Sequence, residues 1–83
     1  AEAQLARLTN GARAEERNEA KAMIRAKQAQ LVQAQRNWKR IHELREQGAV
    51  SQQEADDQQG LVDRLRAELE AAQARSDQLT APA

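Results

Sequence analysis

Few side chains in this sequence have the type and spacing that chemistry on a ligand requires. His42 is the single histidine, and the chain contains no cysteine. A metal site needs several nitrogen, sulfur or oxygen ligands brought together, so the sequence predicts no metal site and no cofactor. No serine or other nucleophile stands beside a base at the spacing of a catalytic pair. We therefore expect a protein that is not an enzyme and that acts by binding.

The pair Arg40 and Leu44 is more informative. Residues four apart share one face of a helix, so these two side chains are expected to lie next to each other. They immediately precede the small apolar stretch "GAVS" at residues 48–51. An arginine beside a leucine at the end of a helix indicates docking, although a solvated arginine and a single exposed leucine are also common on protein surfaces.

The composition limits how large a core the chain can form. Its 83 residues are 40% hydrophobic, but more than half of these are alanine, and Trp38 is the single aromatic residue. Such a chain can line a narrow contact between helices, and its composition is typical of long helices and coiled coils. Its net charge is zero. Without a basic stripe, no nucleic-acid partner is expected.

Two long proline-free segments must position these residues. Asn10-Gly11, Gly48-Ala49-Val50 and Ala81-Pro82 mark the boundaries. We expect the end of a preceding helix and a break at 1–12, the first hairpin helix at 13–47, the tip turn at 48–51, the second helix at 51–79, and a break or the start of the next segment at 80–83. The chain begins in helical sequence, which indicates a piece of a longer protein.

Both segments carry apolar residues at alternating spacings of three and four, the heptad pattern of helices that pack along a line. We call these positions the seam: Ala20, Ile24, Lys27, Leu31, Ala34, Trp38, Ile41 and Arg45, with Ala55, Gln58, Val62, Leu65, Leu69, Ala72, Ser76 and Leu79. Facing positions have residue numbers that sum to 99 or 100, as in an antiparallel pair. The expected fold class is therefore all-α, an antiparallel two-helix coiled-coil hairpin with a short N-terminal helical stub. The polar seam residues Lys27 and Arg45 can lay their stems on the seam and keep their charges in water.

The turn between the segments has its own signals. Gly48 can adopt the left-handed conformation that ends a helix. Ser51 followed by Glu54 predicts a capping box, in which the serine accepts the amide of residue 54 and the glutamate reaches back. Val50 and Ala55 have the spacing of a hydrophobic staple.

Gly60 is unexpected inside the second helix, because glycine costs about 1 kcal/mol relative to alanine there. Trp38 is expected to fill the seam near Gly60 and Val62. Room for its ring would explain the glycine.

The spacing Arg40-x-x-x-Leu44 followed by Ser51 resembles the tip motif of periplasmic adaptors, the membrane fusion proteins of the haemolysin-D-like class. These serve tripartite efflux pumps and type I secretion. "GAVSQQEADD" resembles the Gly-x-x-Ser-x-x-Glu-x-Asp turn of that family, and "RAELEAAQA" resembles its returning helix. "LARLTNGARAEER" is similar to a stretch in adaptors of ABC-type exporters. The resemblance leaves two possibilities after Ala81-Pro82, a further helix or the return to a lipoyl-like half.

The resemblance implies a function. The hairpin would dock through its tip onto a TolC-type outer-membrane channel in the periplasm and bridge it to an inner-membrane exporter, with the parent protein anchored to the inner membrane or secreted to the periplasm. Arg40 would bind carbonyl or acidic groups of the channel, Leu44 would fill an apolar notch, and Ser51 would contact the channel beside Ala49 and Val50. Several copies of the parent would line up as a tube of hairpins. The alternative is a generic coiled-coil spacer or dimerisation hairpin with no channel partner.

Overall fold

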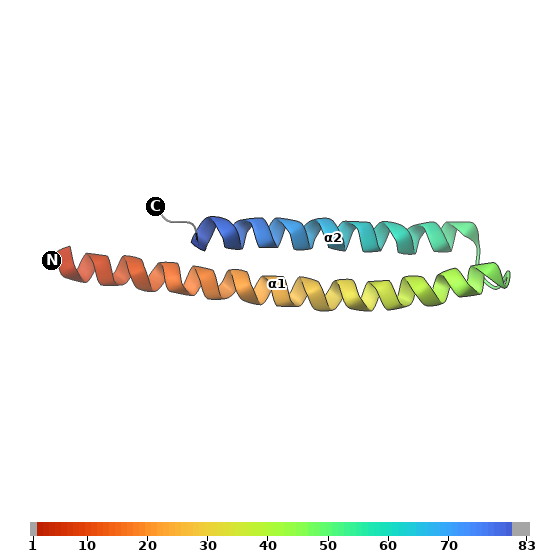
Figure 1. Cartoon of the computed structure of the whole chain (residues 1–83), viewed down its shortest axis with the longest axis horizontal. Coiled ribbons are helices and arrows are strands. Elements are labelled where there is room, and N and C mark those ends of the chain that lie inside the picture. The colour runs from red at the N-terminus through yellow and green to blue at the C-terminus, as the bar shows by residue number, and fades with distance from the viewer. Residues whose placement is uncertain (1, 81–83) are drawn as a thin grey trace.

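The protein forms two antiparallel helices that lie side by side and are joined by a tight turn (Figure 1). The computed structural model describes the backbone of residues 2–80 and the side chains of residues 12–80. Helix α1 spans Glu2–Glu46 and helix α2 spans Gln52–Thr80. The rod measures 69 × 16 × 14 Å. The predicted all-α hairpin is confirmed, and the connecting residues 47–51 include all four residues of the predicted tip turn.

Neither described helix contains a segment apolar and uncharged enough to span a membrane.

The expected helix break at Asn10-Gly11 does not occur. Helix α1 runs through both residues without interruption. Glycine in a helix costs about 1 kcal/mol and asparagine less, whereas proline, which removes a backbone donor, is absent there. The alanine, arginine and glutamate residues on both sides are good helix formers, so the unfavourable pair is carried within one helix. The second expected break, Ala81-Pro82, lies outside the described residues.

Burial follows the predicted seam. The buried residues are Ala20, Ala34, Ala55, Val62 and Leu65. All five are seam positions, and every other seam residue is half-buried except Arg45. A cluster of Ala34, Val62 and Leu65 forms the centre of the core, with the partly buried Leu31, Trp38 and Leu61 packed against it. Because most of the buried side chains are small, the apolar area removed from water is small and we expect the isolated hairpin to be only modestly stable.

The polar seam residues are accommodated in different ways. The Lys27 Nζ atom lies 3.0 Å from Glu68 Oε2 of α2, so its charge is paired across the helices rather than left to water as expected. Arg45 is exposed and donates a hydrogen bond to Gln52 Oε1 at the start of α2. Gln58 is half-buried, and its buried Oε1 atom has no hydrogen-bond partner. These three residues and the half-buried Ser76 interrupt an otherwise apolar contact.

The explanation expected for Gly60 is wrong. A Cβ atom at this position would have no neighbour within 4 Å, so the Trp38 ring does not occupy that space. Gly60 is exposed, whereas Trp38 packs toward Ala34, Val62 and Leu65. The reason is angular: residue 60 lies two positions before seam residue 62, on a different face of α2.

Candidate functional site

Helix α1 ends in a pair of backbone hydrogen bonds that require the chain to reverse direction at Gly48. Gly48 has a φ of 76°, in the left-handed region that L-residues with side chains avoid. Its N–H donates to the Arg45 carbonyl at 2.9 Å, and the Ala49 N–H donates to the Leu44 carbonyl at 2.8 Å. This pair of bonds is the Schellman motif. The chain therefore turns back immediately after the helix, and Leu44 lies within one helical turn of that reversal.

The start of α2 is capped by Ser51. Its Oγ atom accepts a hydrogen bond from the Glu54 N–H at 3.1 Å, which is the serine half of the expected capping box. Among residues 12–80, the Ser51 N–H donates no hydrogen bond to the Glu54 carboxylate, so the second half of the capping box is not formed. Val50 is half-buried and Ala55 is buried, in agreement with a hydrophobic staple at these positions. The turn is thus held from both helix ends.

A second set of contacts, which the sequence interpretation missed, stiffens the first turns of α2. Glutamine amides donate to aspartate carboxylates four residues later, at distances of 2.7 to 3.0 Å. The pairs are Gln52 with Asp56, Gln53 with Asp57, and Gln59 with Asp63. Such pairs each stabilise a helix by a few tenths of a kcal/mol. The repeated Gln-x-x-x-Asp spacing was the available signal.

Five residues were predicted to contact a partner, and we call them the tip residues: Arg40, Leu44, Ala49, Val50 and Ser51. All five lie in the last two turns of α1 or in the connecting residues, so the fold gathers them at one end of the rod (Figure 1). This placement does not identify a partner, because residues gathered at the end of the rod are compatible with docking and with a plain turn.

The exposure of the tip residues differs. Arg40, Ala49 and Ser51 are exposed, whereas Leu44 and Val50 are half-buried. The Arg40 Nη2 atom donates a hydrogen bond to Asn37 Oδ1 at 3.0 Å, one turn earlier on the same helix. Arg40 is therefore oriented by a neutral group and keeps its positive charge without an ion pair among the described residues. A cation of this kind can still bind a carbonyl or carboxylate of a partner.

The single histidine, His42, contacts two neighbours on its own helix. Its ring stacks on Trp38 with centroids 5.0 Å apart, and its Nε2 atom lies 3.2 Å from Glu46 Oε1. In the described part of the chain, no group of three or more histidine, cysteine, aspartate or glutamate residues is placed to hold a metal ion.

A family model described as "RND MFP, alpha-helical hairpin domain" matches residues 16–80, which is more than half of the chain. No curated protein and no solved structure gave a match. The matched range contains the whole turn, all of α2 and the part of α1 that faces it. Most of the stretch that resembles adaptors of ABC-type exporters, residues 5–17, lies before the matched range.

Proposed function

Because the chain belongs to the family of α-helical hairpin domains of RND membrane fusion proteins, we propose that its tip docks onto a TolC-type outer-membrane channel. Members of this family are periplasmic adaptors that in general assemble with an outer-membrane channel and an inner-membrane transporter. The proposal assigns the channel contact to the tip residues and the bridging role to the rod between the tip and the rest of the parent protein.

The single observation that carries the proposal is the hydrogen-bonded turn at the tip, which is capped at both helix ends. The Schellman motif and the Ser51 cap together satisfy backbone groups at the turn and hold its five connecting residues in one conformation. A surface that is already ordered loses little conformational entropy when it binds, which favours docking through this end. The exposed Arg40 and the half-buried Leu44 supply one charged and one apolar contact beside it.

The length of the rod supports the bridging role. At 69 Å, it can separate the two ends of an assembly by much more than the width of a small domain. The narrow cross-section of 16 × 14 Å also leaves most side chains accessible to neighbouring copies, as a tube of hairpins would require.

The test replaces Arg40 with Asp and Leu44 with Asp in the full-length parent and measures export or drug resistance in cells. We expect both changes to abolish export, because a reversed charge opposes the carbonyl or acidic groups of the channel and a carboxylate in an apolar notch loses its hydration. Helicity of the purified variants shows whether the hairpin remains folded.

Two matched controls lie further along α1. Arg36→Asp makes the same charge reversal one turn before Arg40 at an exposed position, and Val32→Asp places a carboxylate on a residue that is 45% exposed. Both controls should leave export unchanged. If the Arg40 and Leu44 variants fold and export normally, the tip does not dock and a coiled-coil spacer becomes the better interpretation.

A further inference from the structure

A groove runs between α1 and α2 on one side of the hairpin, centred on the only tryptophan. Its volume is about 570 Å³, within the range that small-molecule sites occupy. We call it the Trp38 groove, and its lining residues are Gln35, Trp38, Lys39, His42, Glu43, Gln59, Val62 and Arg66. None of them is a tip residue, so the docking function leaves this surface without a role.

The groove has an apolar bottom and an aromatic wall. Val62 is only 5% exposed, and Trp38 is half-buried beside it. The His42 ring stacks on the Trp38 indole with an angle of 13° between the planes and 5.0 Å between the centroids. Stacking covers the facing sides of the two rings, so another aromatic ring would pack against an outer face or an edge of the pair. The shape and chemistry of this wall therefore favour a planar aromatic ligand.

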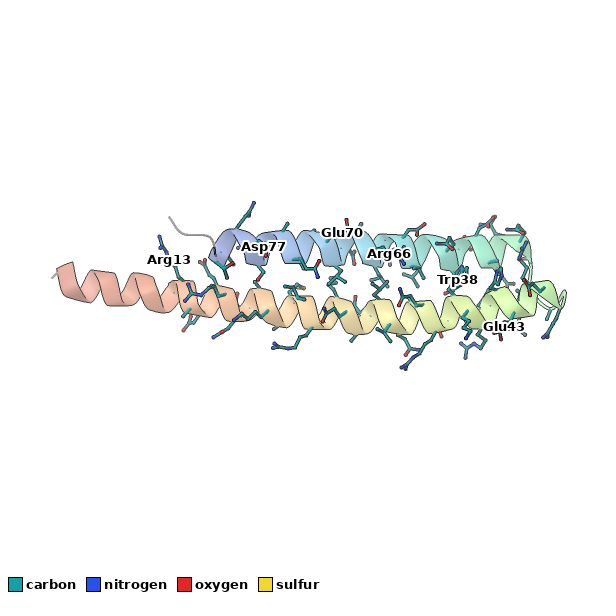
Figure 2. The ribbon with its side chains drawn as sticks, viewed as in Figure 1. Arg13, Trp38, Glu43, Arg66, Glu70 and Asp77 are labelled. Atoms are coloured by element: carbon teal, nitrogen blue, oxygen red, sulfur yellow. The ribbon has the colours of Figure 1, made fainter. Side chains whose placement is uncertain are left out.

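The charges around the groove favour an anion. Lys39 approaches from α1 and Arg66 from α2, and both side chains are exposed. Within residues 12–80, neither one forms an ion pair or a side-chain hydrogen bond. Glu43 is the single carboxylate in the lining. Figure 2 labels Arg66 on α2 and Trp38 on α1, and both residues line the groove.

We propose that the Trp38 groove binds planar aromatic anions, with the ring packed against the Trp38–His42 pair and the acidic group between Lys39 and Arg66. Lys39 and Arg66 come from different helices and line the same groove, so both attract an anion bound there. Guanidinium groups suit this role because they bind carboxylates through two parallel hydrogen bonds. The site lies on the shaft of the hairpin and does not depend on channel docking.

The test uses the 83-residue chain below its melting transition and follows the tryptophan indole N–H by nuclear magnetic resonance. The chain has one tryptophan, so the spectrum contains one such signal and it reports on the groove directly. The probes are 2-naphthoate and 2-naphthylmethylammonium, which share a ring system and differ in charge. We expect 2-naphthoate to shift the signal in a saturable way with a dissociation constant in the millimolar range, and the cation to bind at least about fivefold more weakly.

Two arginine variants locate the anion. Arg66→Ala removes a cation of the groove and should weaken 2-naphthoate binding by about fivefold. Arg64→Ala removes the same charge from the same helix, but Arg64 lines a different groove with Leu61 and Leu65, so its effect should stay within about twofold. Both arginines are exposed, so each variant should keep its helicity, which circular dichroism will check. The proposal is overturned if the signal does not saturate, if both probes bind alike, or if the two variants weaken binding equally.

Discussion

The backbone N–H of Ala49 donates a 2.8 Å hydrogen bond to the carbonyl of Leu44. This bond joins an exposed residue of the connecting segment to the leucine proposed to fill an apolar notch of the channel. The position of Leu44 at the end of α1 therefore depends on the turn that follows it. A change that relaxes the turn should affect docking even where no contact residue is replaced.

Gly48→Ala should destabilise the hairpin. The φ of 76° places a Cβ atom in steric conflict with the backbone, at a cost of about 1 kcal/mol. Crowding by the rest of the protein is not the cause, because apart from the glycine and its chain neighbours no atom lies within 4 Å of a Cβ at this position. Urea denaturation followed by circular dichroism measures the change in the free energy of unfolding. An unchanged midpoint would mean that the turn adopts another conformation in solution.

Gly60→Ala should have the opposite effect and stabilise the hairpin by up to about 1 kcal/mol, because alanine loses less backbone entropy in a helix. The site is exposed and its Cβ would enter open space. The same denaturation measurement serves for both glycines, which makes them a matched pair. A destabilised Gly60→Ala protein would show that something approaches this face of α2 closely, such as a second copy of the hairpin.

Substitutions of Ser51 separate its role as a cap from any role in docking. Ser51→Ala should lower the free energy of unfolding by about 1 kcal/mol, because the Glu54 N–H loses its acceptor. Ser51→Asp should keep most of the stability, since aspartate is an equally good cap. Thermal melting compares the three proteins. If export falls in the Asp variant while its melting temperature is unchanged, the serine side chain also contacts the partner.

Gln58→Leu should raise the free energy of unfolding by about 1 kcal/mol. The Gln58 Oε1 atom is buried without a hydrogen-bond partner, so the folded protein carries the cost of its desolvation. Leucine removes this cost. Gln73→Leu is the control, because Gln73 is exposed on the same helix and its replacement should change stability by less than about 0.5 kcal/mol. Equal effects of the two variants in chemical denaturation would contradict the assignment of Gln58 to the seam.

The Lys27–Glu68 pair should contribute only modestly to stability. Its side chains are 24% and 40% exposed, so water and salt screen the attraction. A double-mutant cycle with Lys27→Ala and Glu68→Ala should give a coupling energy of about 0.5 kcal/mol that decreases in high salt. A coupling that is zero at low salt would show that the two charges do not meet in solution.

The seam and the turn could be predicted because both are local patterns. Spacings of three and four place Ala34, Trp38 and Ile41 on one face of a helix whatever follows, and Gly48 before Ser51 specifies a stop and a start within a few residues. The antiparallel pairing then follows from the short connection. The tip residues could be located in the same way, since their positions depend only on the turn.

Other features depend on competing energies and on side-chain packing, which a spacing pattern does not give. Asn10-Gly11 has the composition of a break, but its cost is small compared with the helix on both sides, so α1 continues. The role expected for Gly60 required the direction of the Trp38 ring, which is set by packing against Val62 and Leu65. The i, i+4 spacing of Trp38 and His42 is visible in the sequence, but spacing alone does not show that the two rings stack.

The single turn also decides which part of the hairpin opens first. Contacts beside the turn join residues close in sequence, such as Arg45 and Gln52 at a separation of 7, whereas Lys27 and Glu68 are separated by 41. Closing the short connection costs less chain entropy than closing the long one, so the helices zip together from the turn. Within the described hairpin, the contacts beside the turn are therefore expected to be lost last. The end of the hairpin that is proposed to bind the channel is therefore the last part to unfold.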